Sequence, residues 1–414
     1  MPDSPRTLKS VLDALDGVPA PSTTDEEWRY SRIGDLDLAR WTVPAAAGEP
    51  LADLSDVLGA LGRTAALVEL VDGFVVGISV DSDAVGAGLQ VGTAAEFPGA
   101  VQPGAVMVEP TDQFAALNTA LATSPVVVDV PANTDISGPV VVLSQTTTEG
   151  ATVAPRLVVR AGANSSVTVV EVQVSSDVAA LVVPVTEIQV GPAARVRYSV
   201  LQDLGPRVWQ VGTLSTSVGQ EATLDAGIAA LGGEYARLRT DCHLVGKGST
   251  GNLSSVYFGE HSQMVDLRTF QTHDAPHSTS NLLFKGAVAD TAHSVYTGLI
   301  KIGHEAAGTN AFQTNRNLKL SEHAWAESVP NLEIEHNDVR CSHASTVGPV
   351  DEDQRFYLES RGVPTPVAER LIVAGFFDEV LDAWPVPDAA GPVRDRLAVR
   401  LDRQVPVATE GGAK

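Results

Sequence analysis

The fold is indicated by a short pattern that recurs four times in the middle of the chain: VRAGANSSV (159–167), IQVGPAARV (188–196), TSVGQEATL (216–224) and VGKGSTGNL (245–253). Its marker glycines, Gly162, Gly191, Gly219 and Gly248, follow one another at intervals of 29, 28 and 29 residues. A β-branched residue stands three positions before each glycine, and an apolar residue stands five positions after it. A register that persists through four copies indicates one supersecondary unit stacked on itself.

The repeating unit is expected to be a strand, a tight glycine turn, a second strand and a longer return. Glycine suits the turn because it adopts positive φ without steric cost. An antiparallel sandwich is the main alternative, but its turns recur every ~8–12 residues and give no reason for a much longer register. We therefore predict a β-helix, or β-solenoid. The pattern weakens after residue 260, where His277 with Leu282 fits poorly and later segments do not fit.

The segments on either side of the repeat predict other elements. Apolar residues at helical spacing predict helices over 6–16 and 112–122, and Asp72-Gly73 between two apolar runs predicts a hairpin over 67–80. Near the C-terminus, Gly362 and then Thr365-Pro366 separate two further helices, which close the fold. The expected organisation is a mixed, mostly helical N-terminal domain over 1–124, a β-helix core over 125–348, a helical domain over 349–400, and a disordered tail over 401–414.

Composition limits the classes of function. The 414 residues include 51 acidic and 28 basic side chains, so the formal net charge is −23 and phosphate backbones or anionic lipids would be repelled. The two cysteines, Cys242 and Cys341, exclude a disulfide framework and any four-cysteine metal site within one chain. No stretch of the sequence has the length and apolarity of a membrane span, and Met1–Pro5 lack the features of a signal peptide. These features favour a reducing, cytoplasmic setting.

Chemistry-bearing side chains gather toward the end of the expected core. Eight of the nine histidines fall between 261 and 343: His261, His273, His277, His293, His304, His323, His336 and His343. The densest cluster is Glu333–His343, and in a strand Cys341 and His343 would share one face because they are two residues apart. A thiolate with an imidazole is a donor pair suited to iron or iron–sulfur chemistry. One chain supplies too few donors to complete such a site, and a packed thiol beside a polar histidine is the competing interpretation.

Several stretches of the sequence carry a family resemblance. The strongest runs from Pro330–Ile334 through Asp338–His343 to Asp351–Gln354, Phe356–Leu358 and Ser360–Gly362. Further stretches are Glu27–Tyr30, Leu117–Ala120, Lys285–Ala287 and Gly298–Ile300. Together they resemble the SufD branch of the SufB/SufD family of iron–sulfur cluster assembly proteins. The likeness extends over nearly the whole chain and is weakest from 31 to 110.

The resemblance implies a right-handed parallel β-helix between an N-terminal helical domain and C-terminal helices. It also implies a non-catalytic subunit that pairs with a SufB-like scaffold through the β-helices and binds a SufC-like ATPase through its C-terminal helices. The family's interface histidine corresponds to His343 and its neighbouring cysteine to Cys341, so both would contact iron or a nascent cluster that is transient and shared with the partner. A homodimer of the isolated chain is a further expectation, and the sequence carries no signal for or against a flavin.

Three alternatives stay open at this point. In a SufB-like scaffold the cysteine stands in a Gln-Cys-Asp context, whereas the matching stretch here is Gln313-Thr314-Asn315, which favours SufD. A self-sufficient metal-binding β-helix protein would hold tightly bound metal when purified alone. A β-helix polysaccharide lyase or hydrolase would need clustered carboxylates and usually a secretion signal.

Overall fold

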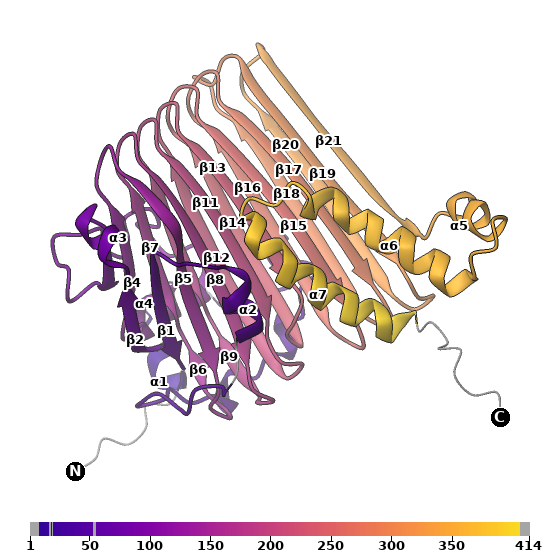
Figure 1. The fold of residues 1–414 in the computed structure, drawn as a ribbon, viewed down its shortest axis with the longest axis horizontal. Coiled ribbons are helices and arrows are strands. Elements are labelled where there is room, and N and C mark those ends of the chain that lie inside the picture. Colours follow the sequence, from indigo (N-terminus) through magenta and orange to yellow (C-terminus); the bar gives the residue numbers. More distant parts are fainter. Residues whose placement is uncertain (1–7, 16–17, 19, 53–54, 406–414) are drawn as a thin grey trace.

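Two long β-sheets form the body of the molecule (Figure 1). The computed structural model describes residues 8–15, 18, 20–52 and 55–405. Sheet I has ten strands, in the order β2 (Phe74–Val80), β1 (Ala66–Val71), β5 (Asp135–Thr146), β8 (Ser166–Ser175), β11 (Arg195–Asp203), β13 (Thr223–Ala230), β15 (Thr250–Gly259), β17 (Thr279–Val288), β19 (Thr309–Lys319) and β21 (Val339–Pro349).

Sheet II faces it. Its strands are β20 (Trp325–Ile334), β18 (His293–Ile302), β16 (Met264–His273), β14 (Tyr235–Leu244), β12 (Val208–Val218), β10 (Val185–Val190), β7 (Arg156–Ala161), β4 (Val126–Val130) and β3 (Gln90–Thr93), with β6 (Thr152–Val153) and β9 (Ala180–Val182) beside β12. From β4 to β21 the chain alternates between the sheets, and the long strands between the two ends pair in parallel with those of the coils before and after them. The predicted β-solenoid is confirmed.

Inward-facing side chains form continuous columns through sheet I. One column is Val167, Val196, Leu224, Gly251, Ser280, Ala311 and Cys341, and its neighbour is Val169, Tyr198, Ala226, Leu253, Leu282, Gln313 and His343. Apolar members of both columns pack against sheet II in the main core between the sheets. The fourth copy of the sequence pattern is therefore two residues out of register, because Leu253 pairs with Ala226 and not with Leu224.

The expected role of the marker glycines is wrong for three of the four. Gly162, Gly191 and Gly219 do not have positive φ; that conformation belongs to Asn164 (φ 56°), Ala193 (56°) and Glu221 (55°), two residues later. A Cβ on Gly162 or Gly191 would lie 2.6 or 2.7 Å from backbone atoms of the preceding coil. Glycine is needed there because the coils approach too closely for a side chain. The equivalent position in the fourth copy is Gly246, and Gly248 (φ 70°) takes the place of Glu221.

The coils also continue beyond residue 260, where the sequence pattern predicted decay. β16 to β21 pair in the same parallel arrangement as the earlier strands. Their inner positions hold polar residues such as Gln271, Ser280, Gln313 and Asn315, all buried. The apolar marker is lost at these positions although the backbone repeat persists.

The N-terminal region packs mainly on the outside of sheet II, places one of its helices beside the C-terminal helices over sheet I, and adds strands to both sheets. Its helices are α1 (Leu8–Leu12), η1 (Glu26–Trp28), η2 (Ile33–Asp35), η3 (Leu38–Arg40), α2 (Ser55–Ala60), α3 (Ser82–Gly86) and α4 (Gln113–Leu121). Leu8, Trp28, Trp41 and Phe114 pack against outward-facing residues of sheet II. The hairpin predicted over 67–80 is confirmed as β1 and β2. The region is thus less helical than expected, because β1, β2 and β3 extend the sheets upstream of residue 125.

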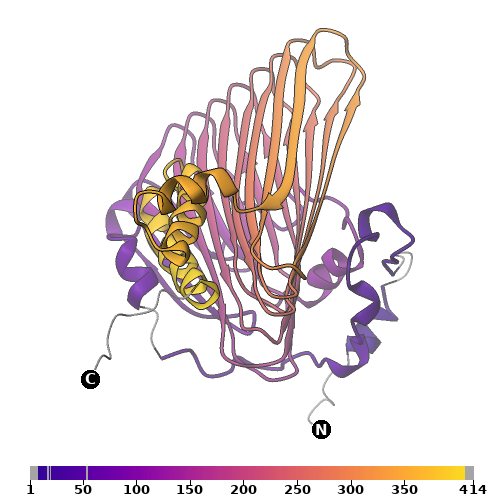
Figure 2. The same cartoon turned by 90° about the vertical axis from the view of Figure 1, so that its right-hand side faces the viewer.

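Three C-terminal helices follow β21, where the sequence indicated two. They are α5 (Glu352–Glu359), α6 (Thr365–Leu381) and α7 (Pro387–Gln404). α6 and α7 cover the outer face of sheet I together with α2, on the opposite side of the solenoid from α1, η1 and α4 (Figure 2). Since α7 continues to Gln404, residues 401–404 of the expected tail are helical, and 406–414 lie outside the described residues. No helix among the described residues is long and apolar enough to span a membrane.

Candidate metal site at the open end of the solenoid

The last coil of the solenoid ends in two strands that pair on one side only. β21 pairs with β19 and β20 pairs with β18, so the far edge of each strand is unpaired within the described residues. Apolar side chains of this coil are exposed: Leu332 is 37% exposed, Ile334 45% and Val347 42%. Unpaired strand edges beside exposed apolar residues are typical of a surface that another chain covers.

Cys341 and His343 lie on this open end. Both belong to β21 and stand opposite Ala311 and Gln313 of β19, whose side chains are buried inside the solenoid. The two side chains therefore share the inner face of the terminal strand, as the sequence predicted. Cys341 is half-buried against Ile300, Ile302, Ala306 and Ala311, whereas His343 is exposed.

The burial of Cys341 affects how readily its sulfur can bind a metal ion. Burial raises the pKa of the Cys341 thiol above its ordinary value, so the thiol is protonated near neutral pH. Metal binding through this sulfur must release that proton. The imidazole of His343 is exposed at the same end of the solenoid, so it is the more accessible donor of the two.

The rest of the cluster that the sequence singled out does not converge on this pair. Glu333 pairs with Lys301 at 2.6 Å, and Glu335 lies 3.6 Å from His304. Nδ1 of His336 accepts the backbone N–H of Asp338 at 3.0 Å. Within the described ranges, no group of three or more His, Cys, Asp or Glu side chains is arranged to hold a metal ion. Two donors from this chain leave positions for other ligands.

His273 shows why histidine density alone was a poor guide. Its side chain is fully buried, with Nδ1 2.8 Å from Ser278 Oγ and Nε2 2.9 Å from Ser280 Oγ. Burial lowers the pKa of His273 to about 4. Both ring nitrogens are occupied by serine hydroxyls, so this histidine is a neutral structural residue.

A second surface lies beside the C-terminal helices. A groove of about 890 Å³ runs between α5, α6 and the outer face of sheet I, lined by Lys285, Arg316, Leu318, Pro349, Asp351, Asp353, Gln354, Tyr357, Leu358, Leu371, Ile372, Gly375, Phe376 and Glu379. Phe356, Tyr357 and Leu371 on these helices are 70%, 56% and 53% exposed. At the floor of the groove the buried Lys285 ammonium pairs with Glu379 and donates to the backbone oxygen of Phe376 at 2.7 Å. Sequence reasoning gave Lys285 no role; its position within the apolar strand run Leu282–Val288 was the available signal.

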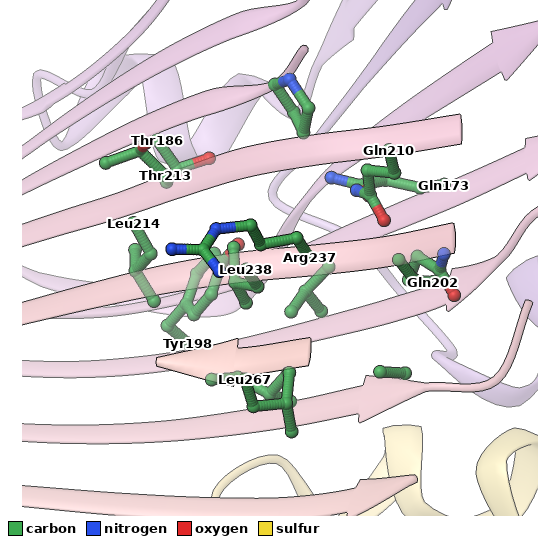
Figure 3. A pocket seen from close by; sticks show the side chains of 15 residues that line it. Gln173, Thr186, Tyr198, Gln202, Gln210, Thr213, Leu214, Arg237, Leu238 and Leu267 are labelled. Atoms are coloured by element: carbon green, nitrogen blue, oxygen red, sulfur yellow. The ribbon is translucent and has the colours of Figure 1, made fainter. Parts of the chain in front are cut away.

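An internal cavity in the middle coils is polar but small (Figure 3). It measures about 30 Å³, and Gln173, Thr186, Tyr198, Gln202 and Gln210 are among its lining residues. Beside it, the buried Glu171 accepts hydrogen bonds from Gln173, Thr186 and Tyr198. A volume of this size holds one or two water molecules and no larger ligand.

Comparison with known proteins places the chain in a family. The family model described as "SUF system FeS cluster assembly, SufBD core domain" matches residues 143–376, more than half of the chain. An iron–sulfur cluster assembly SufBD family protein of Mycobacterium tuberculosis is 33% identical over 307 residues, covering 72% of this chain and 75% of the relative. The SufD proteins of Bacillus subtilis and Escherichia coli are 29% identical over 296 residues (71% of this chain, 67% of theirs) and 34% identical over 182 residues (44% and 43%). The chain therefore belongs to the SufBD family of the SUF system, and within it is SufD-like.

Proposed function

We propose that this chain is a SufD-like, non-enzymatic subunit of an iron–sulfur cluster assembly complex. It pairs through the open end of its solenoid with a SufB-like scaffold and binds a SufC-like ATPase through its C-terminal helices. The observation that carries the proposal is the position of His343 and Cys341 on the inner face of a terminal strand whose far edge is unpaired. The two free cysteines accord with a reducing, cytoplasmic setting.

In this proposal iron or a nascent cluster is the cargo of the site. His343 donates one imidazole nitrogen, and Cys341 adds a thiolate once its proton is lost. The partner chain supplies the remaining ligands, including the essential thiolate. Two donors on this side give an incomplete and therefore releasable site, which suits a cargo that must leave for other proteins.

Pairing with another chain is supported by the strand edges. An incoming strand can form main-chain hydrogen bonds with β20 or β21, while Leu332, Ile334 and Val347 lose exposed apolar surface. Such pairing buries His343 and Cys341 at the shared seam. The same edges would allow two copies of this chain to pair when the SufB-like partner is absent.

The proposed ATPase contact is the groove beside α5 and α6. Tyrosine is enriched in the hot spots of protein interfaces, and Tyr357 lines this groove, with the exposed Phe356 next to it on α5. Because α5 and α6 follow β21 directly along the chain, a partner bound in this groove lies close in sequence to the strand that carries His343.

The donor role is tested with His343→Ala in the complex purified from cells together with its partners. Complex assembly is expected to persist, because His343 is exposed and its imidazole packs no core, whereas iron and sulfide content falls several-fold. His323→Ala is the matched control, since it removes another exposed imidazole, from the turn before β20. Unchanged iron and sulfide content in the His343→Ala complex would exclude a role of His343 as a donor. Stoichiometric, tightly bound metal in the chain purified alone would favour the self-sufficient alternative.

A further inference from the structure

Gln313 carries a buried amide that lacks partners. Its side chain is 1% exposed, and neither Nε2 nor Oε1 makes a hydrogen bond within the described residues. Buried polar groups in native proteins are nearly always paired, because an unpaired one loses its hydration without compensation. Such an amide keeps donor and acceptor capacity for a group that the chain alone does not supply.

The amide lies beneath the candidate site. Gln313 stands opposite His343 in the parallel pairing of β19 with β21, on the same inner face, and neighbouring strands are about 4.8 Å apart. The side chain extends across the interior toward sheet II, where Nε2 lies 2.5 Å from the place a Cβ on Gly298 would occupy. Gly298 in turn pairs with Pro330 of the last coil. The glycine leaves room for the amide, which forms part of the floor of the open end.

We propose that Gln313 is a positioning residue for His343, an inference that rests on the donor role proposed above. In the metal-bound complex, Oε1 of Gln313 accepts the N–H of one ring nitrogen of His343. The other ring nitrogen then keeps its lone pair for iron. Metal-bound histidines usually donate their second N–H to an oxygen in this way, which fixes the tautomer and the orientation of the ring.

Gln271 provides an internal control. It is also fully buried, and both of its amide atoms likewise lack partners. It lies on β16, opposite Ile300, and so outside the column that ends in His343. Replacing either glutamine with leucine removes an unpaired amide from the interior, so both changes should have similar effects on folding.

The test is anaerobic titration of the partner-containing complex with Fe²⁺ alone, for the wild type, Gln313→Leu, Gln313→Glu and Gln271→Leu. We expect Gln313→Leu to weaken iron binding by about 10- to 100-fold, the usual effect of losing such a partner. Gln271→Leu should bind iron as the wild type does. Both leucine variants should unfold at the same denaturant concentration as the wild type or at a higher one. Gln313→Glu keeps an acceptor oxygen at the same reach and should restore binding.

The outcomes separate this inference from the proposed function. Wild-type iron binding by Gln313→Leu, together with loss of binding in His343→Ala, overturns the positioning role and leaves the donor role intact. Equal losses in Gln313→Leu and Gln271→Leu also overturn it, because the amides would then act only on the packing of the interior. If His343→Ala binds iron normally, both proposals fail. Should Gln313→Glu not fold, the comparison of the two leucine variants decides.

Discussion

The two kinds of glycine in the solenoid turns should respond differently to alanine. Gly162→Ala places a Cβ 2.6 Å from the backbone nitrogen of Ala132, 2.8 Å from the carbonyl carbon of Pro131 and 2.9 Å from the oxygen of Val130. An ordinary contact of a Cβ with these atoms needs ~3.4 Å or more. The coils cannot move apart freely, because the Gly162 N–H donates to the same Val130 oxygen at 2.9 Å and holds them together. The coils must separate or bend, and we expect a loss of about 3 kcal/mol in the free energy of unfolding, typical of severe overpacking.

Gly248→Ala is the comparison. Gly248 has φ 70°, and a Cβ there would meet only Cγ of Glu221, at 3.5 Å. We expect Gly248→Ala to lower the free energy of unfolding by about 1 kcal/mol, because alanine is strained in the left-handed conformation. Denaturant unfolding of both variants measures the difference between their free energies of unfolding, provided that the dependence on denaturant concentration has the same slope in both. A larger loss of stability in Gly248→Ala than in Gly162→Ala would show that positive φ, and not the close approach of the coils, limits the turns.

Two further predictions concern acid stability and the groove proposed to bind the ATPase. The folded state keeps His273 neutral down to about pH 4, whereas the unfolded chain protonates it near pH 6.5, so the free energy of unfolding falls as the pH drops through this window, by up to about 3 kcal/mol at pH 4. In denaturant unfolding, His273→Gln should lose less stability than the wild type over the same pH range. Equal losses in the two proteins would contradict a neutral, buried His273. Leu371→Asp, in the groove, should reduce co-purification of the SufC-like ATPase at least ~10-fold with a change in unfolding free energy below ~0.5 kcal/mol. Val399→Asp on α7, where the side chain is 52% exposed, is the control, and equal effects of the two changes would exclude the groove.

The repeat of the solenoid was readable from the sequence because its early coils fill their inner columns with Val and Leu. Val167, Val196 and Leu224 do pair in register, as the spacing predicted. The hairpin at Asp72-Gly73 was equally clear, because both residues have positive φ and few residue pairs adopt that turn. In the early coils and at the hairpin, the residue pattern in the sequence matches the pairing of strands in the structure.

The core was expected to reach residue 348, but the sequence repeat could not be followed through the later coils, for a physical reason. Their inner columns change from apolar to polar at Ser280 and Gln313, so hydrophobic periodicity fades while main-chain pairing continues. Following the columns by register would have led directly to Cys341 and His343 at their ends. The unpaired amide of Gln313 could not be found from sequence, because only the packing of β18 against β19 shows that the amide is buried and lacks a partner.

His343 can reach ligands from a partner only if the open end of the solenoid is a seam between subunits. Hydrogen–deuterium exchange of the chain alone and in its complex with the SufB-like partner measures this directly. We predict that amides of β20 and β21 become protected in the complex, while those of β2, the edge strand at the opposite end of sheet I, exchange as before. Protection at β2 with unchanged exchange across β21 would contradict the account, since His343 would then face no partner.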